Sequence, residues 1–427
     1  MRVMIEGQDL TAWALAGSLA STGCNVTMKL PTLPMENNDV NEPDLLRLLQ
    51  LQLQSKRLIL DVVDNQSELL ILAEDMVHAN GYIAFLKGLY EQDNISFRQL
   101  RVIALVQAVP IGTSELLQQW LDSQNLSFIH VVYWPSFVQA GRSLESVTRP
   151  ERILLGSDST DATELMRGLL SPFNRSRDSL MIMSLKEAEL SKLAINGMLA
   201  TRVSFMNEIA HLAEQHQVDV ERVRQGVGSD SRIGFQYLYP GCGFGGQAFL
   251  NTLYQLSGAI DQMAAGEGRN LLRSVYDINE QQKDLLFQKF WRYFRADIKG
   301  KRVAMWGCAF KPNTASVEGS PALTLVNALL AHDVHVSIYD PRALESLKKH
   351  ITNHDLLDFV DTPEQALLSA DALMLVTEWK EFWNLDMATL RLQMNTPLLL
   401  DGRNIYDPKQ MSLQGWKYSG VGRGTSL

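Results

Sequence analysis

The first thirty residues alternate between strand-like and helix-like sequence, and this pattern constrains the fold more than any other feature. Residues 3–5 (Val-Met-Ile) are apolar, Gly7 marks a turn, residues 11–21 read as a helix, and residues 25–28 form a second strand-like run. A strand, a helix and a second strand in this order form a βαβ unit, whose strands pair in parallel through a right-handed crossover. The N-terminal part is therefore predicted to be an α/β domain.

Strand-like runs continue in both halves of the chain. Further apolar runs are predicted to complete a parallel sheet in the N-terminal part, at residues 101–106, 128–133, 152–155 and 180–184. A second α/β unit is expected from Lys301, with strands at 303–306, 334–339, 372–376 and 397–400 and a helix at 322–331. We therefore predict an α/β fold with two Rossmann-like, doubly wound parallel-sheet domains joined by a long central helix.

That long helix is predicted at residues 186–217, which contain few helix-breaking residues. Its apolar side chains fall on more than one side, at Leu190, Leu193, Ala194, Met198, Ala200, Val203, Phe205, Ile209 and Leu212. A helix of this length and character is normally buried between domains or between subunits. More helix is expected to about residue 294. The predicted domains are 1–185, a central helical domain at 186–295, and 296–427.

Composition argues against several classes of function. The chain has 427 residues and a net charge of −9 without a run of lysine or arginine, so neither nucleic acid nor an anionic membrane is an expected partner. The three cysteines, Cys24, Cys242 and Cys308, lie far apart, so we expect no disulfide framework and no metal site. This usage fits a reducing cytoplasm. We find no signal peptide and no apolar run of about 18 residues, so neither secretion nor membrane spanning is expected.

Six blocks of sequence occur in an order that points to one family. They are the helical segment 189–208, the loop 232–246 (Arg-Ile-Gly leading into Pro-Gly-Cys-Gly-Phe-Gly-Gly), and the segments 303–314, 376–379 (Val-Thr-Glu-Trp), 401–404 (Asp-Gly-Arg-Asn) and 418–423 (Tyr-Ser-Gly-Val-Gly-Arg). Together they resemble the UDP-glucose/GDP-mannose dehydrogenase family, in its UDP-glucose 6-dehydrogenase-like form. The resemblance extends from about residue 1 to about residue 424.

The resemblance implies a fold, a reaction and an assembly. Residues 1–185 would be the NAD-binding domain, 186–295 the domain that carries the active-site loop and forms a homodimer, and 296–427 the UDP-sugar-binding domain. In that family the C6 alcohol of the sugar is oxidised twice to a carboxylate, and two hydrides pass to NAD. A cysteine captures the aldehyde and forms a thioester that water then hydrolyses.

The expected nucleophile is missing. The family pattern Gly-Gly-Ser-Cys-Phe-Pro-Lys-Asp is replaced by Gly-Gly-Gln-Ala-Phe-Leu-Asn-Thr at residues 245–252. Ala248 stands for the cysteine and cannot form a covalent adduct. Asn251 and Thr252 stand for the lysine and the aspartate. Cys242 and Cys308 are the alternative thiols, and both are expected to be small buried hydrophobic residues.

The acid–base groups are lost in part. The family segment Pro-Glu-Phe-Leu-Arg-Glu-Gly is Pro-Ser-Phe-Val-Gln-Ala-Gly at residues 135–141, so Ser136 and Ala140 replace both glutamates. Lys192 and Asn196 are retained, and the resemblance implies that they donate hydrogen bonds to the oxyanion at C6. Their spacing of four residues places them on one helix face. A solvated surface lysine is the alternative reading of Lys192.

The dinucleotide fingerprint is degenerate. After the first strand, Gly-x-Gly-x-x-Gly is replaced by Gly-Gln-Asp-Leu-Thr-Ala at residues 7–12, which keeps Gly7 and brings Asp9 to the place of the pyrophosphate. The acidic residue expected after the second strand is absent, and Lys29 lies there instead. We predict that Gly7 is a plain strand–helix turn and that no cofactor binds, with NAD as the cofactor under the alternative reading.

The nucleotide-sugar site is better retained. Phe244, Gly245 and Gly246 would allow the backbone to approach a substrate closely. The resemblance assigns substrate contacts to Lys311 and Arg403, for which surface charge is the alternative interpretation. The family's Thr-Asp-Asp-x-Arg is Thr-Ala-Ser-Val-Glu at residues 314–318.

Three functions are compatible with this sequence. The first is an inactive relative of UDP-glucose 6-dehydrogenase that binds a nucleotide sugar, forms a homodimer and acts with partner proteins of polysaccharide synthesis. The second is an active NAD-dependent UDP-sugar dehydrogenase with a rewired site. The third is a dimeric interaction protein without a ligand. We favour the first, because the nucleophile, the paired glutamates and the cofactor fingerprint are lost together.

Overall fold

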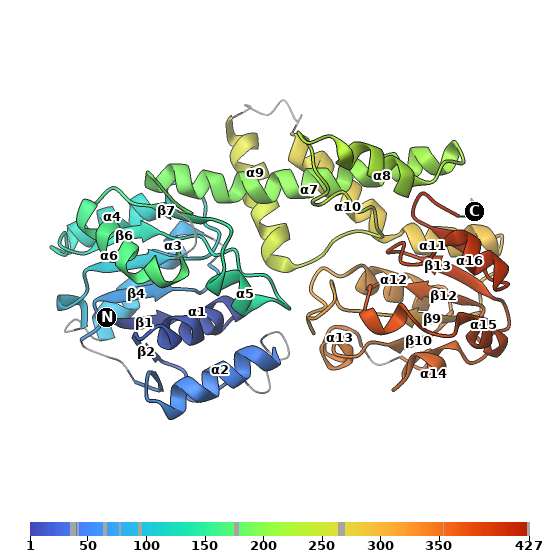
Figure 1. Cartoon of the computed structure of the whole chain (residues 1–427), viewed down its shortest axis with the longest axis horizontal. Coiled ribbons are helices and arrows are strands. Elements are labelled where there is room, and N and C mark those ends of the chain that lie inside the picture. Colours follow the sequence, from blue (N-terminus) through green and yellow to red (C-terminus); the bar gives the residue numbers. More distant parts are fainter. Residues whose placement is uncertain are drawn as a thin grey trace. The chain divides into compact units, whose positions relative to one another are not determined.

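The computed structural model describes residues 1–34, 40, 42–62, 66–76, 78–92, 96–174, 179–263, 270–352 and 354–424. The chain divides into two compact units, residues 1–195 and 196–427 (Figure 1). The predicted boundaries near 185 and 295 stay a prediction. No helix within the described residues is long and apolar enough to cross a lipid bilayer.

The N-terminal unit is built on one sheet with helices on both faces. Its strands are β1 (Arg2–Glu6), β2 (Asn25–Met28), β3 (Leu58–Leu60), β4 (Leu69–Leu72), β5 (Val102–Leu105), β6 (His130–Tyr133), β7 (Ile153–Gly156) and β8 (Leu180–Met183). Its helices are α1 (Leu10–Ser21), α2 (Pro43–Gln54), α3 (Ala79–Gln92), α4 (Thr113–Ser123), α5 (Ser143–Thr148) and α6 (Thr160–Leu170), with short 3-10 turns at Ser96–Arg98 and Ser171–Phe173.

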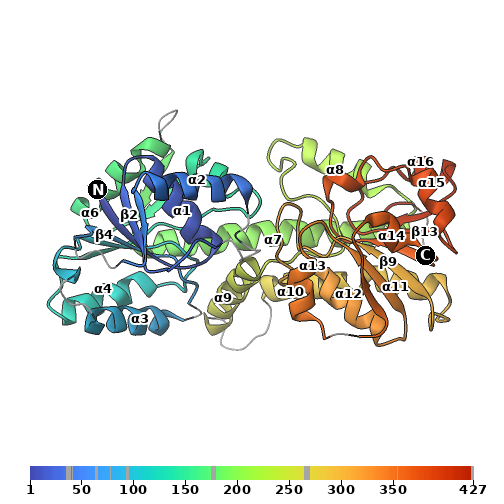
Figure 2. The same cartoon turned by 90° about the horizontal axis from the view of Figure 1, so that it is seen from below.

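The strand order in this sheet is β3-β2-β1-β4-β5-β6-β7-β8. Strands β1 to β6 are parallel and follow the Rossmann order 3-2-1-4-5-6. One hydrophobic cluster lies between one face of the sheet and helices α1, α2, α5 and α6. A second cluster lies between the other face and helices α3 and α4 (Figure 2). The predicted βαβ unit, strand-like runs and fold class are confirmed.

One part of the predicted sheet is wrong. The run at 152–155 was expected to add a parallel strand, but β7 pairs antiparallel with β6, at Tyr133 and Gly156. The reason is the connection between them: α5 has six residues and spans only about 9 Å, which is too short to carry the chain back across the sheet. The longer α6 does carry it back, so β8 is parallel to β7.

The C-terminal unit contains a second Rossmann-like sheet. Its strands are β9 (Arg302–Trp306), β10 (His335–Tyr339), β11 (Leu357–Phe359), β12 (Ala372–Leu375), β13 (Leu398–Asp401) and β14 (Lys417–Gly420). They are all parallel, in the order β11-β10-β9-β12-β13-β14. The main hydrophobic cluster of this unit surrounds β9 and β12, whose side chains are buried on both faces, and a smaller cluster involves α7 (Leu185–Gln215), α8 (Val220–Ser229) and α11 (Leu285–Tyr293).

The remaining helices follow the long helix α7 (Leu185–Gln215), which contains the boundary between the units. They are α8 (Val220–Ser229), α9 (Gln247–Met263), α10 (Leu271–Lys283), α11 (Leu285–Tyr293), α12 (Pro321–Leu330), α13 (Leu344–His350), α14 (Pro363–Leu367), α15 (Met387–Leu390) and α16 (Pro408–Leu413), with 3-10 turns at Lys380–Phe382 and Arg391–Gln393.

Candidate functional site

The turn between β1 and α1 has a structural reason for its glycine. Gly7 has a φ of +152°, and a Cβ at this position would lie 2.9 Å from the Cβ of Ala73, which follows β4. The glycine therefore allows β1 and the end of β4 to approach each other closely. A packing role accounts for Gly7 without a ligand.

Asp9 occupies the anion-binding end of α1. Its Oδ1 accepts the backbone N–H of Ala12 at 2.8 Å as the N-cap, and its Oδ2 accepts the side-chain amide of Gln107 at 2.5 Å. The same amide donates to the carbonyl of Ala73 at 2.7 Å. Burial, reinforced by the charges of Glu74 and Asp75, raises the pKa of Asp9 to about 6.

The residues of this turn do not fit the pyrophosphate of a dinucleotide. A Rossmann fold binds the phosphates on the N–H groups at the start of this helix. Here a carboxylate of the chain already accepts one of those N–H groups, and further carboxylates lie close by. Repulsion between like charges at a half-buried site opposes phosphate binding.

Lys192 lies in the N-terminal part of α7, among residues of the same unit. Its ammonium donates to the carbonyl of Ser136 at 2.8 Å and lies 4.4 Å from the centroid of the Phe137 ring. Burial and the positive charge of Arg152 lower the pKa of Lys192 to about 8. The guanidinium carbon of Arg152 is 5.7 Å from the same ring. Sequence reasoning missed Arg152, because a single arginine before a strand carries no motif.

Ala248 is the second residue of α9 and is exposed. The neighbouring polar groups are satisfied without a thiol. The hydroxyl of Thr252 donates to the carbonyl of Ala248 at 2.8 Å, and the side-chain amide of Asn196 donates to the Thr252 hydroxyl at 3.2 Å. Asn196 therefore has a partner in the protein at the place where the family pattern has an aspartate.

The other thiols are buried. Cys242 and Cys308 have no exposed surface and belong to the C-terminal core. Burial raises the pKa of both thiols, which suppresses the reactive thiolate. The prediction that both are buried hydrophobic residues is confirmed.

The glycine-rich loop at 241–246 is held by buried amides. Asn279 accepts the N–H of Phe244 at 2.8 Å and donates to its carbonyl at 3.0 Å. Asn207 accepts the N–H of Gly241 at 2.9 Å, and Gln282 donates to the carbonyl of Gly241 at 2.7 Å. Sequence reasoning missed these anchors, because a single asparagine or glutamine on a helix has no distinctive spacing.

The two glycines of the predicted substrate contact pack against the chain itself. A Cβ at Gly245 would lie 2.6 Å from the carbonyl oxygen of Gly319, and Gly246 has a φ of +93°. The N–H of Gly246 donates to the carbonyl of Glu318 at 2.9 Å. The backbone of Gly245 and Gly246, which is predicted to approach a substrate closely, therefore packs in this structure against residues 318–319.

Arg403 is a largely buried anchor, and one of its nitrogens has no partner among the described residues. Its Nε donates to the carbonyl of Val376 at 2.7 Å, and its Nη1 donates to the carbonyl of Gly243 at 3.0 Å. Nε also lies 3.3 Å from a carboxylate oxygen of Glu378. Nη2 is buried and has no hydrogen-bond partner among the described residues. Lys311 lies beside the ring of Phe310, at 5.6 Å from its centroid.

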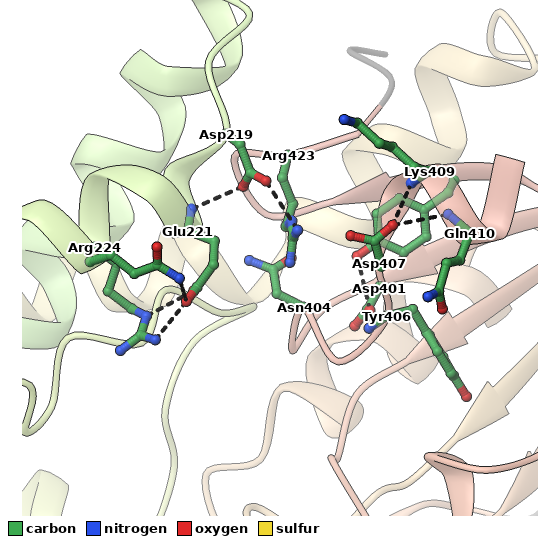
Figure 3. Close-up of polar contacts among 12 residues, drawn as sticks. Asp219, Glu221, Arg224, Asp401, Asn404, Tyr406, Asp407, Lys409, Gln410 and Arg423 are labelled. Atoms are coloured by element: carbon green, nitrogen blue, oxygen red, sulfur yellow. Dashed lines mark hydrogen bonds and ion pairs between the residues drawn. The ribbon is translucent and has the colours of Figure 1, made fainter.

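The last sequence blocks supply structural contacts. Arg423 donates to Asp219 at 3.1 Å, and Asp219 caps α8 (Figure 3). Asn404 exchanges two hydrogen bonds with the backbone of Val421. Asp401 accepts the N–H groups of Arg403 and Tyr406. Residues 401–404 and 418–423 therefore fix the carboxyl ends of β13 and β14.

Comparison with known proteins gives consistent matches along the whole chain. Residues 186–281 match the central domain of the UDP-glucose/GDP-mannose dehydrogenase family, and residues 304–408 match its UDP binding domain. The UDP-glucose 6-dehydrogenase of Pseudomonas aeruginosa is 35% identical over 446 residues, covering 99% of this chain and 98% of that protein. The UDP-glucose 6-dehydrogenase of Rhizobium meliloti is 35% identical over 326 residues, covering 75% and 73%.

Solved structures show the same fold. A UDP-glucose dehydrogenase from Pyrobaculum islandicum superposes with a TM-score of 0.80 at 24% identity, covering 95% of this chain and 94% of that one. A UDP-D-ManNAc dehydrogenase from Pyrococcus horikoshii superposes with a TM-score of 0.81 at 21% identity, covering 100% of both chains. The similarity in sequence over nearly its full length means that this chain belongs to the UDP-glucose/GDP-mannose dehydrogenase family.

Proposed function

We propose that this protein is a member of the family that binds a nucleotide sugar without oxidising it. The observation that carries the proposal is Ala248. A methyl group stands where the family's reaction needs a thiol, and no described residue supplies one there, since Cys242 and Cys308 are enclosed in the core. Thioester chemistry requires a sulfur atom at the sugar.

The β1–α1 turn supports the same proposal. The carboxylate of Asp9 takes the N–H of Ala12, and its surroundings are acidic, so we infer that NAD does not bind there. Without a hydride acceptor, neither oxidation step can proceed. The loss of the nucleophile and the loss of the cofactor site are separate changes with the same consequence.

Features that favour binding remain in the C-terminal unit. The loop at 241–246 is held rigidly by Asn207, Asn279 and Gln282, and a pre-organised loop loses little entropy when a ligand binds. Among the residues that the structure describes, the buried Nη2 of Arg403 has no hydrogen-bond partner, and an oxygen of a ligand would satisfy it. A UDP-sugar has such oxygens. This site and the family membership support a UDP-sugar as the class of ligand.

We also propose that the protein is a homodimer. On α7, Met198, Phe205 and Leu212 are 63%, 49% and 50% exposed. They are spaced by seven residues, so they form one apolar stripe along the helix. An apolar stripe of this kind is typical of a surface that is covered by a partner. A protein that binds a UDP-sugar and associates with other chains could act together with partner proteins of polysaccharide synthesis, and we propose this role.

Two measurements test the proposed function. Purified protein is incubated with NAD and UDP-glucose, and NADH is followed by absorbance, with the Pseudomonas aeruginosa relative as a positive control. We expect no NADH above a blank. Calorimetry is then run with NAD and with UDP-glucose separately. We expect binding of the UDP-sugar and none of NAD at millimolar concentration; turnover, or normal NAD affinity, would refute the proposal.

A further inference from the structure

A cavity in the C-terminal unit lies between the end of α7 and the start of α16. Its volume is about 470 Å³, and cavities that bind small molecules typically measure about 300 to 1,000 Å³. No described residue of its lining belongs to the glycine-rich loop at 241–246 or to the predicted substrate contacts. The cavity is therefore a candidate site of its own. The charged residues of its lining are Glu214, Asp219, Asp407, Lys409 and Arg423.

Two carboxylates of this lining are paired with cations of the same unit. The buried ammonium of Lys289 donates to both carboxylate oxygens of Glu214, at 2.8 and 2.7 Å. Nη2 of Arg423 donates to Asp219 at 3.1 Å, and Asp219 also caps α8. The lining has one further acid and one further base, so the positive and negative charges around the cavity balance. Such a cavity favours neither a simple anion nor a simple cation.

The start of α16 presents an acid and a base that are not paired with each other. Oδ1 of Asp407 accepts the backbone N–H groups of Lys409 and Gln410, each at 3.0 Å, as the N-cap of α16. Oδ2 of Asp407 and the exposed ammonium of Lys409 have no hydrogen-bond partner within the part of the chain that the structure describes. Figure 3 shows these two side chains on one side of Arg423 and Asp219 on the other. One acceptor and one cationic donor are thus left for a ligand.

Arg423 gives a second and independent indication of a ligand. Its side chain is only 10% exposed, and its buried Nε has no hydrogen-bond partner among the described residues. Buried polar groups of native proteins nearly always have a partner, because an unsatisfied group loses its hydration without compensation. A ligand carboxylate beside this guanidinium supplies the missing acceptor.

We propose that this cavity binds a small zwitterion of the α-amino acid class. The carboxylate of the ligand contacts Arg423 and Lys409, and its ammonium contacts Asp407. A ligand that carries both charges preserves the balance of the lining, whereas an anion alone meets the carboxylates and a cation alone meets the two bases. Apart from Val218, Pro408 and a glycine, the lining is polar or charged, so the ligand is expected to have a polar side chain. The inference does not depend on the binding of a UDP-sugar.

The test begins with the full chain and each of the standard L-amino acids at about 10 mM, because a ligand that binds only the folded state raises the unfolding temperature. We expect at least one polar amino acid to do so. Calorimetry then compares that amino acid with two analogues, the amine that lacks its α-carboxylate and the acid that lacks its α-amine. Each analogue should bind at least about tenfold more weakly, because each loses one charge-assisted contact.

Two variants separate the two halves of the site. Lys409→Met should weaken the amino acid about tenfold and leave the affinity of the amine analogue unchanged. Asp407→Asn, whose side chain can still cap α16, should weaken the amino acid and leave the affinity of the acid analogue unchanged. The matched control is Lys349→Met, at an exposed position of α13 outside the cavity, which should bind as the wild type does.

Three results would overturn the inference. The first is that no standard amino acid raises the unfolding temperature or binds in calorimetry. The second is that an analogue with one charge binds as tightly as the amino acid. The third is that both variants weaken the amino acid and its analogues by the same factor, because the side chains would then only support the structure. The unfolding temperatures of the variants without ligand show whether they are folded.

Discussion

At the scale of single residues, Asp9 makes the stability of the β1–α1 turn depend on pH. Its pKa is raised from 3.8 to about 6, mainly by burial, so the folded protein holds the proton more tightly than the unfolded chain. The contribution of Asp9 to the free energy of unfolding is therefore largest below about pH 4, and it is lost as the pH rises through about 6. Asp9→Asn is neutral throughout and can still cap α1, although it changes the contact with Gln107 at every pH.

We expect the stability of Asp9→Asn, relative to wild type, to rise by about 1 to 3 kcal/mol between pH 4 and pH 7. Urea unfolding at the two pH values measures this difference. Asp407→Asn, at the exposed N-cap of α16, is the control and should show no comparable rise. A relative stability of Asp9→Asn that stays constant with pH would mean that the carboxylate is not strained at this turn.

Ala248 leads to a prediction about thiol reactivity. The native protein has buried cysteines only, so a thiol reagent should modify almost none of them before unfolding. Ala248 is exposed, and Ala248→Cys should add one rapidly reacting thiol. NADH formation should still be absent, because Ser136, Ala140 and Asp9 remain. Rapid modification of the wild-type protein would contradict the burial of Cys242 and Cys308, and turnover by Ala248→Cys would show that the cofactor site is intact.

At the scale of elements, the glycine-rich loop depends on α10. Asn279 has no exposed surface and satisfies both backbone groups of Phe244. Asn279→Ala leaves those groups without a partner, so we expect a loss of stability of about 2 to 4 kcal/mol and weaker binding of the UDP-sugar. Chemical denaturation and calorimetry measure the two effects. Gln281→Ala, exposed on the same helix, should change neither; an equally small effect of Asn279→Ala would mean that the loop is held by other contacts.

Elements with a clear period were predictable, and so were most of the short apolar runs, but one central strand was not. The strand β1, the helix α1 and the long helix α7 follow directly from their sequence patterns. The strand β4 was missed, although it is fully buried beside β1. Its sequence Leu-Leu-Ile-Leu has no alternation, and four leucine-rich residues fit a helix as well as a strand. Burial on both faces, which decides between them, exists only once the sheet has formed.

The candidate site was predictable where a motif marks it. Ala248, Asp9 and Lys192 were identified from spacing and resemblance, whereas the anchors Asn207 and Asn279 were not. Their role depends on which backbone groups the fold brings to them, and that information is not local in the sequence. Arg152 acquires its significance in the same way, through the ring that it shares with Lys192.

At the scale of the whole molecule, the apolar stripe on α7 requires a partner surface. Phe205 is about half exposed and lies in the middle of the stripe, so its replacement by a charge leaves the core intact and places that charge in the proposed dimer interface. We expect light scattering to give twice the mass of one chain for the wild type and the mass of a single chain for Phe205→Glu. Leu413→Glu, at a residue that is 88% exposed on α16, is the control and should remain dimeric.

Circular dichroism must show that Phe205→Glu is folded, since an interface variant that unfolds reports on stability alone. A monomeric wild type, or a Phe205→Glu variant that stays dimeric, would mean that α7 does not form the interface. The apolar stripe would then be a surface open to another protein.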